Sequence, residues 1–347
     1  MKCRLGIVVA ALVILGGITG CPRGSGKIKL AFISNNAHDF WKIAEKGTQQ
    51  AEKDFGVEVE FKMPGGGGTA DQQQKIMEDL LTRGVKGIAI SPNDAANLMD
   101  FFKKVKKDGV PLVMQDSDVP DPALRRCYIG THNYRAGRAA GELALKAAPE
   151  GGKIVIFVGK LDVSNAVERR QGVLDVLAGI DRKEIDPKAV TPPDAANVKF
   201  GKYLLLETRT DGGKRETCKD RADEILTKHN DIACMIGLWE YNPPAMLLAV
   251  KASKHAKKPI IVGFDEAYET LDGIKDGSVI GTIVQNPYKF GYESMKILAA
   301  LAKGDESILK QYPDMDSQNR IFIPHRVITN DNVEAFYTEL KKLKGEK

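Results

Sequence analysis

The chain has 347 residues, of which 43% are apolar and 28% are charged, and its formal net charge at pH 7 is +5. This length is sufficient for two domains of ordinary size, and the composition is typical of a soluble globular protein. The excess of positive charge is small and dispersed along the chain, which argues against nucleic acid as a partner.

Residues 1–20 are predicted to be an export signal. Lys2 and Arg4 precede a run of apolar and small residues at 5–20, which is short for a span that stays in a membrane. The ending Ile-Thr-Gly-Cys resembles the lipobox of bacterial lipoproteins, which implies that Cys21 is lipidated and becomes the new N-terminus. A plain signal peptide and an uncleaved anchor are the alternatives. Residues 21–27 then form a flexible tether, and the expected location is extracytoplasmic, at the membrane, in the periplasm or on the cell surface.

Three further cysteines remain in the mature chain, namely Cys127, Cys218 and Cys234. Their odd number and the lack of a CxxC spacing argue against a disulfide framework and against a zinc site. Whether two of them pair is left open, and no metal or cofactor is expected.

Apolar, strand-like runs alternate with amphipathic helical stretches after the tether. In the first half, strands are predicted at 27–34, 57–62, 87–91, 111–115 and 127–130, and helices at 39–55, 71–83 and 94–108. The pattern then restarts, with helices at 134–146, 167–177, 214–228, 244–253, 268–275, 288–302 and 332–344, and strands at 153–159, 203–207, 232–237, 259–264, 279–284 and 320–324. Apolar strands alternating with helices predict an α/β fold of two doubly wound parallel sheets.

Polar and aromatic side chains follow the strands in both halves. Ligands of open parallel sheets bind beyond the carboxyl ends of the strands, so these positions are the candidates for a site. The candidates are Asn36, His38, Phe40, Trp41, Asp116, Arg169, Trp239, Asn242, Asp265 and Gln285. Asn35, Asn93, Ser117, Asn165, Glu240 and Tyr241 also follow strands but are not selected. If the two edges face each other, they enclose a cleft between the domains.

Such a set of side chains suits a sugar. Carboxylates and amides match hydroxyl groups, and flat aromatic rings cover the C–H faces of a sugar ring. Each residue also has a structural interpretation: Asp39, Asp71 and Asp94 are expected to be helix caps, and Phe40 or Trp41 alone would suit a core. The functional interpretation depends on the whole set.

Several segments resemble the periplasmic sugar-binding proteins of the ribose/galactose type. They are SNNAHDFW followed by KIAEKG, GVPLVMQDSD, NAVERRQG, LWEYNPPA, IIVGFDEA and TIVQNPYKFG. The resemblance implies sugar contacts from the paired aromatics and from Asp116, Arg169, Asn242, Asp265 and Gln285, although one alignment would place the arginine contact at Val167. Ser117 stands where the ribose binders have arginine, so the particular sugar stays open.

The resemblance also implies an architecture and partners. It is the type I periplasmic binding protein fold, with lobes at 28–131 plus 286–314 and at 132–285 plus 315–347. Hinge strands are expected near Thr131–Asn133, Phe264–Glu266 and Gln285–Pro287. The implied function is that of a monomeric receptor that closes on a monosaccharide and docks on the membrane permease of an ABC importer. The related transcription regulators of the lactose-repressor family carry a helix-turn-helix segment where this chain has the predicted export signal, so the regulator alternative is rejected.

Signals of catalysis are missing from the sequence. The stretch PGGGGTA lacks the Lys-Ser/Thr of a P-loop, and no GxSxG or HExxH motif occurs. Asp116 and Asp265 could be a glycosidase acid/base pair, but nothing favours this over two hydroxyl acceptors. The remaining alternatives are a receptor for an amino acid, a nucleoside or a signalling compound that reports to a membrane sensor, and an exported enzyme.

Overall fold

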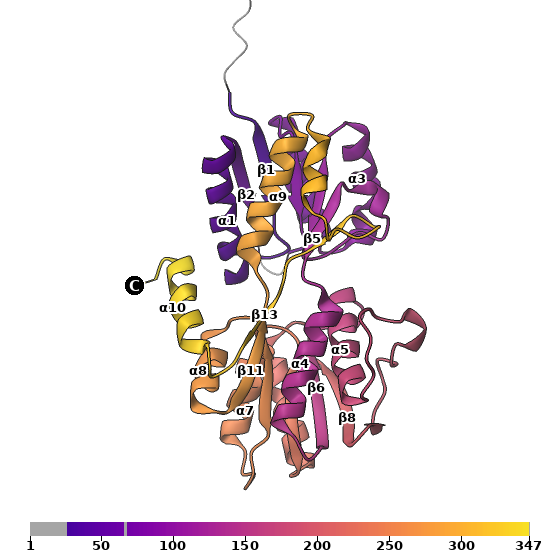
Figure 1. The fold of residues 1–347 in the computed structure, drawn as a ribbon, viewed down its shortest axis with the longest axis vertical. Coiled ribbons are helices and arrows are strands. Elements are labelled where there is room, and N and C mark those ends of the chain that lie inside the picture. Colours follow the sequence, from indigo (N-terminus) through magenta and orange to yellow (C-terminus); the bar gives the residue numbers. More distant parts are fainter. Residues whose placement is uncertain (1–25, 66–67, 347) are drawn as a thin grey trace, which may run out of the picture.

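The computed structural model describes residues 26–65 and 68–346, which form two α/β lobes joined by several chain crossings (Figure 1). The predicted export signal, Cys21 and most of the tether lie outside the described residues, as do Gly66 and Gly67 of the glycine-rich stretch.

The first lobe (residues 28–130 and 287–322) is built on a six-stranded sheet in the order β12-β5-β4-β3-β1-β2, with every pairing parallel. Its strands are β1 (Lys29–Ile33), β2 (Glu58–Lys62), β3 (Ile88–Ile90), β4 (Leu112–Gln115), β5 (Cys127–Gly130) and β12 (Arg320–Phe322). Its helices are α1 (Asp39–Phe55), α2 (Ala70–Thr82), α3 (Ala95–Lys107) and α9 (Pro287–Leu301), with short 3-10 helices η1 (Pro122–Leu124) and η3 (Glu306–Gln311). Leu30 and Phe32 of β1 pack with α1 and α9, whereas Ala31 and Ile33 pack with α2 and α3. The sheet is therefore covered on both faces, which explains its apolar strands.

The second lobe (residues 133–284 and 326–346) has a seven-stranded sheet in the order β13-β11-β10-β9-β6-β8-β7, in which only the edge strands β13 and β7 pair antiparallel. Its strands are β6 (Gly152–Val158), β7 (Val198–Phe200), β8 (Tyr203–Thr210), β9 (Ile232–Gly237), β10 (Ile260–Phe264), β11 (Val279–Val284) and β13 (Arg326–Ile328). Its helices are α4 (Asn133–Ala147), α5 (Ser164–Leu177), α6 (Arg215–Lys228), α7 (Asn242–Ala252), α8 (Tyr268–Asp276) and α10 (Val333–Lys344), with the 3-10 helix η2 (Pro187–Ala189). Cys234 and Ile236 of β9 pack toward α4 and α5, and Met235 packs toward α6 and α7.

The chain passes between the lobes three times, after β5, after β11 and after β12. Two of the predicted hinges, near Thr131–Asn133 and Gln285–Pro287, coincide with these crossings. The third prediction, Phe264–Glu266, is wrong, because β10 and α8 on either side of it both belong to the second lobe. The third crossing lies at residues 323–325 instead. The assignment of 315–347 to the second lobe is likewise wrong for β12, which pairs with β5 in the first sheet.

Helix starts are fixed by capping side chains that sequence analysis identified only in part. Asp94 caps α3 as predicted, because its carboxylate accepts from the backbone N–H of Asn97 at 3.1 Å. At α1 the cap is His38 and at α2 it is Thr69, so Asp39 and Asp71 lie in the first helical turn, where negative charge favours the helix dipole.

Candidate ligand-binding site

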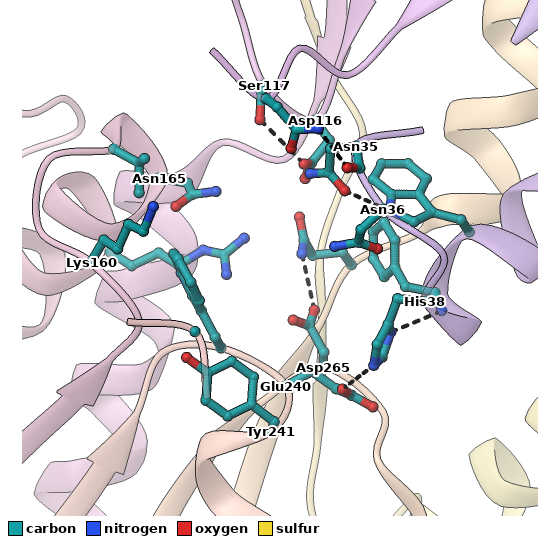
Figure 2. A pocket seen from close by; sticks show the side chains of 18 of the residues that line it. Asn35, Asn36, His38, Asp116, Ser117, Lys160, Asn165, Glu240, Tyr241 and Asp265 are labelled. Carbon is teal, nitrogen blue, oxygen red and sulfur yellow. Dashed lines mark hydrogen bonds and ion pairs between the residues drawn. The ribbon is translucent and has the colours of Figure 1, made fainter. Parts of the chain in front are cut away.

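A cavity of about 470 Å³ lies between the two lobes, where the carboxyl ends of both sheets meet (Figure 2). Nine of the predicted residues line it: Asn36, His38, Phe40, Trp41, Asp116, Arg169, Trp239, Asp265 and Gln285. They come from both lobes, so a molecule in the cavity would contact both.

Two aspartates on opposite lobes share an unusual backbone conformation. Asp116 follows β4 and Asp265 follows β10, and each has φ of 62°, in the left-handed region that few residues other than glycine, asparagine and aspartate adopt. The N–H of Asp116 donates to Ile129 O at 3.0 Å, and that of Asp265 donates to Ile283 O at 2.8 Å. In each lobe the turn is therefore tied to the neighbouring strand.

The carbonyl groups of the same two aspartates are held in a similar way. The hydroxyl of Tyr128 donates to Asp116 O at 2.9 Å, and the hydroxyl of Thr282 donates to Asp265 O at 2.8 Å. These contacts fix the backbone and leave the carboxylates directed toward the cavity that both residues line. The lobes thus present one carboxylate each by the same local device.

Burial sets the protonation of these carboxylates. Desolvation raises the pKa of Asp116 and raises that of Asp265 to about 6, while the positive charge of Arg169 opposes both shifts. Gln285 also donates from Nε2 to Asp265 Oδ1 at 3.0 Å, which favours the ionised form. The other carboxylate oxygen of Asp265, Oδ2, remains able to accept from a ligand.

Arg169 is anchored firmly at the wall of the cavity. Only 2% of its surface is exposed; its Nε donates to Asn133 Oδ1 and its Nη1 to Leu238 O, both at 2.9 Å. The guanidinium group also lies 4.4 Å from the ring centroid of Phe264, in a cation–π contact. These contacts orient the guanidinium group and use its Nε and Nη1 as hydrogen-bond donors. Its Nη2 donates to no acceptor within the described residues.

The aromatic residues of the site have two different surroundings. Trp41 is 2% exposed and packs in the core of the first lobe, with its Nε1 donating to Asn35 Oδ1 at 2.8 Å. Phe40 packs edge-on against Trp41, with ring centroids 4.8 Å apart. Trp239 is less buried, and its ring covers the backbone of Gly159, where an added Cβ would lie 1.9 Å from the indole ring.

Several buried polar atoms of the cavity have no hydrogen-bond partner within the described residues. They are Asn36 Oδ1, Asn165 Oδ1 and Trp239 Nε1, two acceptors and one donor. Buried polar groups in folded proteins are almost always hydrogen-bonded, so these atoms are available to a polar ligand.

Asn242 is the predicted residue that the structure does not bring to the cavity. It is fully buried at the start of α7, where Nδ2 donates to Asp211 Oδ2 at 2.9 Å and Oδ1 accepts from the N–H of Trp239 at 2.9 Å. Its role is to hold the loop after β9. Asp211 also accepts from the hydroxyl of Tyr241 at 2.5 Å and from the N–H of Gly213 at 2.9 Å. Asp211 therefore organises one wall of the cavity, a role that its place after β8 in the sequence did not reveal.

Further residues line the cavity without having been selected from the sequence. They include Asn35, Asn93, Lys160, Asn165, Glu240 and Tyr241. All of them follow strands, so their position was a signal, but nothing in the sequence ranks one polar loop residue above another. Behind them, Gln73 of α2 donates to Ser34 O and Ser91 O, which ties the ends of β1 and β3 together.

Within residues 26–65 and 68–346, no group of three or more His, Cys, Asp or Glu side chains could hold a metal ion. No helix in these residues has the length and apolar character needed to cross a membrane. Cys127, Cys218 and Cys234 are buried free thiols, and burial raises the pKa of each to about 12, so they are held as neutral packing groups.

Comparison with known proteins gives a consistent result. The chain is 23% identical over 295 residues to the D-allose-binding periplasmic protein of Escherichia coli, covering 83% of this chain and 88% of that protein. It is 22% identical over 312 residues to the ribose import binding protein of Salmonella typhimurium, covering 89% and 96%.

A solved structure shares the architecture. A solute-binding protein of an ABC transporter from Burkholderia graminis, in complex with D-arabinose, matches with a TM-score of 0.74 and 26% identity, covering 88% of this chain and 96% of that one. The family model described as a periplasmic binding protein domain matches residues 31–306. With this match across most of its length, and with two parallel-sheet lobes that enclose a polar cavity, the chain belongs to the periplasmic binding protein family.

Proposed function

We propose that the protein is the extracytoplasmic receptor of an ABC-type sugar importer and binds one monosaccharide in the cavity between its lobes. The observation that carries this proposal is the lining of the cavity. Carboxylates, amides, one guanidinium group and aromatic rings converge there from both lobes. Two of the relatives of this chain are named for allose and ribose.

The roles of the residues follow from their chemistry. Asp116 and Asp265 accept hydrogen bonds from sugar hydroxyls, and Gln285 joins the ligand to the hinge after β11. Asn36 both donates and accepts, and Arg169 donates from its free nitrogen. Trp239, with Phe40 and the edge of Trp41, covers the C–H faces of the sugar ring.

Ligand binding and lobe closure are coupled in this proposal. A sugar that contacts both lobes makes more contacts in the closed form than in the open form, and only this difference can shift the equilibrium toward closure. The closed protein, as a monomer, is then the form that the membrane permease receives. No chemical conversion of the sugar is part of this cycle.

A panel of candidate ligands tests the function. Pentoses, hexoses, polyols and amino acids are screened by thermal shift, and each hit is measured by calorimetry and analysed for reaction products. We expect saturable binding of one or a few sugars and recovery of the sugar unchanged. A response confined to amino acids, or conversion of a sugar to product, would contradict the proposal.

Membrane attachment through Cys21 is a separate part of the proposal. It depends on the Ile-Thr-Gly-Cys sequence alone. When the full precursor is expressed in bacteria, a labelled fatty acid should be incorporated and the protein should fractionate with membranes. Cys21→Ser should abolish both. Membrane association that persists in this variant without label would favour an uncleaved anchor instead.

A further inference from the structure

An ion pair joins the two lobes at the cavity between them. Nε2 of His38, at the start of α1 in the first lobe, lies 3.1 Å from Oε2 of Glu240, which follows β9 in the second lobe. Figure 2 shows the two side chains meeting from facing walls of the cavity, which both residues line. His38 was expected to contact the ligand, but Glu240 occupies its outer nitrogen.

This pair has no counterpart elsewhere between the lobes. Among the described residues, every other ion pair joins side chains of one lobe, or of one lobe and an adjacent hinge segment. The start of α1 is also where the lobes touch through apolar groups, because Ile43 packs in the same cluster as Val333 and Phe336 of α10. The polar pair and the apolar contact therefore lie at one end of the same helix.

The histidine can make this contact without a net charge. Its Nδ1 accepts from the backbone N–H of Phe40 at 3.4 Å as the cap of α1, so a neutral ring with its proton on Nε2 satisfies both nitrogens. The acidic groups that face it are Glu240 and Asp265 from the second lobe and Asp39 on its own helix. The hydrogen bond to Glu240, followed by these charges, raises the pKa of His38, so acid strengthens the contact with Glu240.

We infer that His38 and Glu240 form a latch that holds the lobes closed over the bound ligand and slows its release. The pair can exist only when the lobes are close, so opening about the three crossings must break it. The ion pair stabilises the closed form whatever the ligand is, because the ligand takes no part in the contact between His38 and Glu240. This regulation of the site rests on the proposed function.

Two single variants break the ion pair of the latch. His38→Asn keeps a strong helix cap but is too short to reach Glu240, and Glu240→Ala removes the acceptor. The side chains are 47% and 26% exposed, so the pair has the modest strength of a surface ion pair. Each variant should raise the ligand release rate constant on the order of two- to fivefold, and the double variant should add little to either.

Release is measured by stopped-flow tryptophan fluorescence with D-ribose, or with the tightest sugar of the panel. Lys42→Met is the matched control, since it removes an ion pair with Asp39 in the same turn of α1 that does not reach the second lobe. Unchanged release in both single variants, or additive effects in the double variant, would overturn the latch.

Small-angle scattering of the ligand-free protein separates this inference from the proposed function. The latch predicts a larger radius of gyration for His38→Asn and Glu240→Ala than for the parent and Lys42→Met. If no sugar of the panel binds, the proposed function fails, and the latch is then tested by scattering alone. Equal radii of gyration for the parent and the three variants would overturn the latch.

Discussion

At the scale of single residues, the two aspartates of the cavity are set apart by their backbone. Both Asp116 and Asp265 have φ of 62°, and aspartate and asparagine tolerate this conformation because their short polar side chains bond locally. Alanine at either position would change the charge and strain the turn together. Asparagine changes the charge alone, which makes it the informative substitution.

Asp265→Asn should weaken sugar binding by on the order of ten- to a hundredfold. A hydrogen bond to a charged group is worth roughly 1.5–3 kcal/mol, and about 1.4 kcal/mol corresponds to a factor of ten in affinity. Calorimetry with the sugar identified in the panel measures the loss. Asp272→Asn, on the exposed face of α8, is the control and should leave the affinity unchanged. Equal affinity for Asp265→Asn and the parent would remove Asp265 from the site.

The protonation of Asp265 predicts how affinity depends on pH. Its pKa is raised to about 6 by burial, and only the ionised carboxylate accepts fully from sugar hydroxyls. Below pH 6 the proton must leave on binding, so affinity should fall by up to about tenfold for each pH unit, and above pH 7 it should level off. Calorimetry between pH 5 and 8 checks this. Asp265→Asn should flatten the profile, and the same titration in His38→Asn removes the opposing contribution of the histidine.

At the scale of elements, the loop between β9 and α7 depends on contacts that come from distant strands. Asp211, after β8, accepts hydrogen bonds from Tyr241 in this loop and from Asn242, the first residue of α7. Gly159, after β6, leaves room for the ring of Trp239. The position of Trp239 and Tyr241 in this loop therefore depends on the order of β8, β6 and β9 in the sheet.

Gly159→Ala should displace the ring of Trp239 from this wall. The added Cβ would lie 1.9 Å from the indole ring, and overpacking of this kind costs roughly 1–3 kcal/mol. We expect weaker sugar binding, a loss of the fluorescence change on binding and a lower melting temperature. Gly65→Ala, where nothing lies within 4 Å of the added Cβ, should behave as the parent. An unchanged fluorescence response in Gly159→Ala would mean that Trp239 does not report on the ligand.

At the scale of the whole molecule, the three crossings leave the lobes free to change their relative orientation while each sheet stays intact. The carboxylates sit on opposite sides of the gap, with Asp116 in the first lobe and Asp265 in the second. A ligand that binds both carboxylates therefore gains a strong contact when the lobes close.

Saturating sugar should therefore lower the radius of gyration of the parent protein in small-angle scattering. In Asp116→Asn the first lobe loses its carboxylate and keeps only its amide and aromatic contacts, so the change at equal occupancy should be smaller. Compaction equal to that of the parent would show that closure does not depend on the first-lobe carboxylate.

The same sugar at 100 times its dissociation constant should stabilise the fold by about 2.7 kcal/mol, visible as a rise in melting temperature.

Local sequence patterns determined the elements and their order. The strand after the tether, the helix that follows it and the alternation through both halves are set by apolar periodicity and capping groups, which act over a few residues. The short edge strands β7 and β13 were not predicted, because each has three mostly exposed residues and lacks the continuous apolar run that marks β3. The strand at 320–324 was predicted, but its pairing with β5 joins segments far apart in the chain, so the sequence could not tell that β12 belongs to the first sheet. The third crossing therefore lies after β12 and not at Phe264–Glu266.

The sequence also determined which side chains follow each strand, since a parallel sheet brings those positions to one edge. It could not determine which of their atoms stay free for a ligand. Asn242 follows β9 as the other candidates follow their strands, yet its side-chain amide is hydrogen-bonded to Asp211 and Trp239. Likewise, Nε2 of His38 is paired with Glu240 of the other lobe. Those partners are far apart in the chain, and only the packing of strands and lobes brings them within hydrogen-bonding distance.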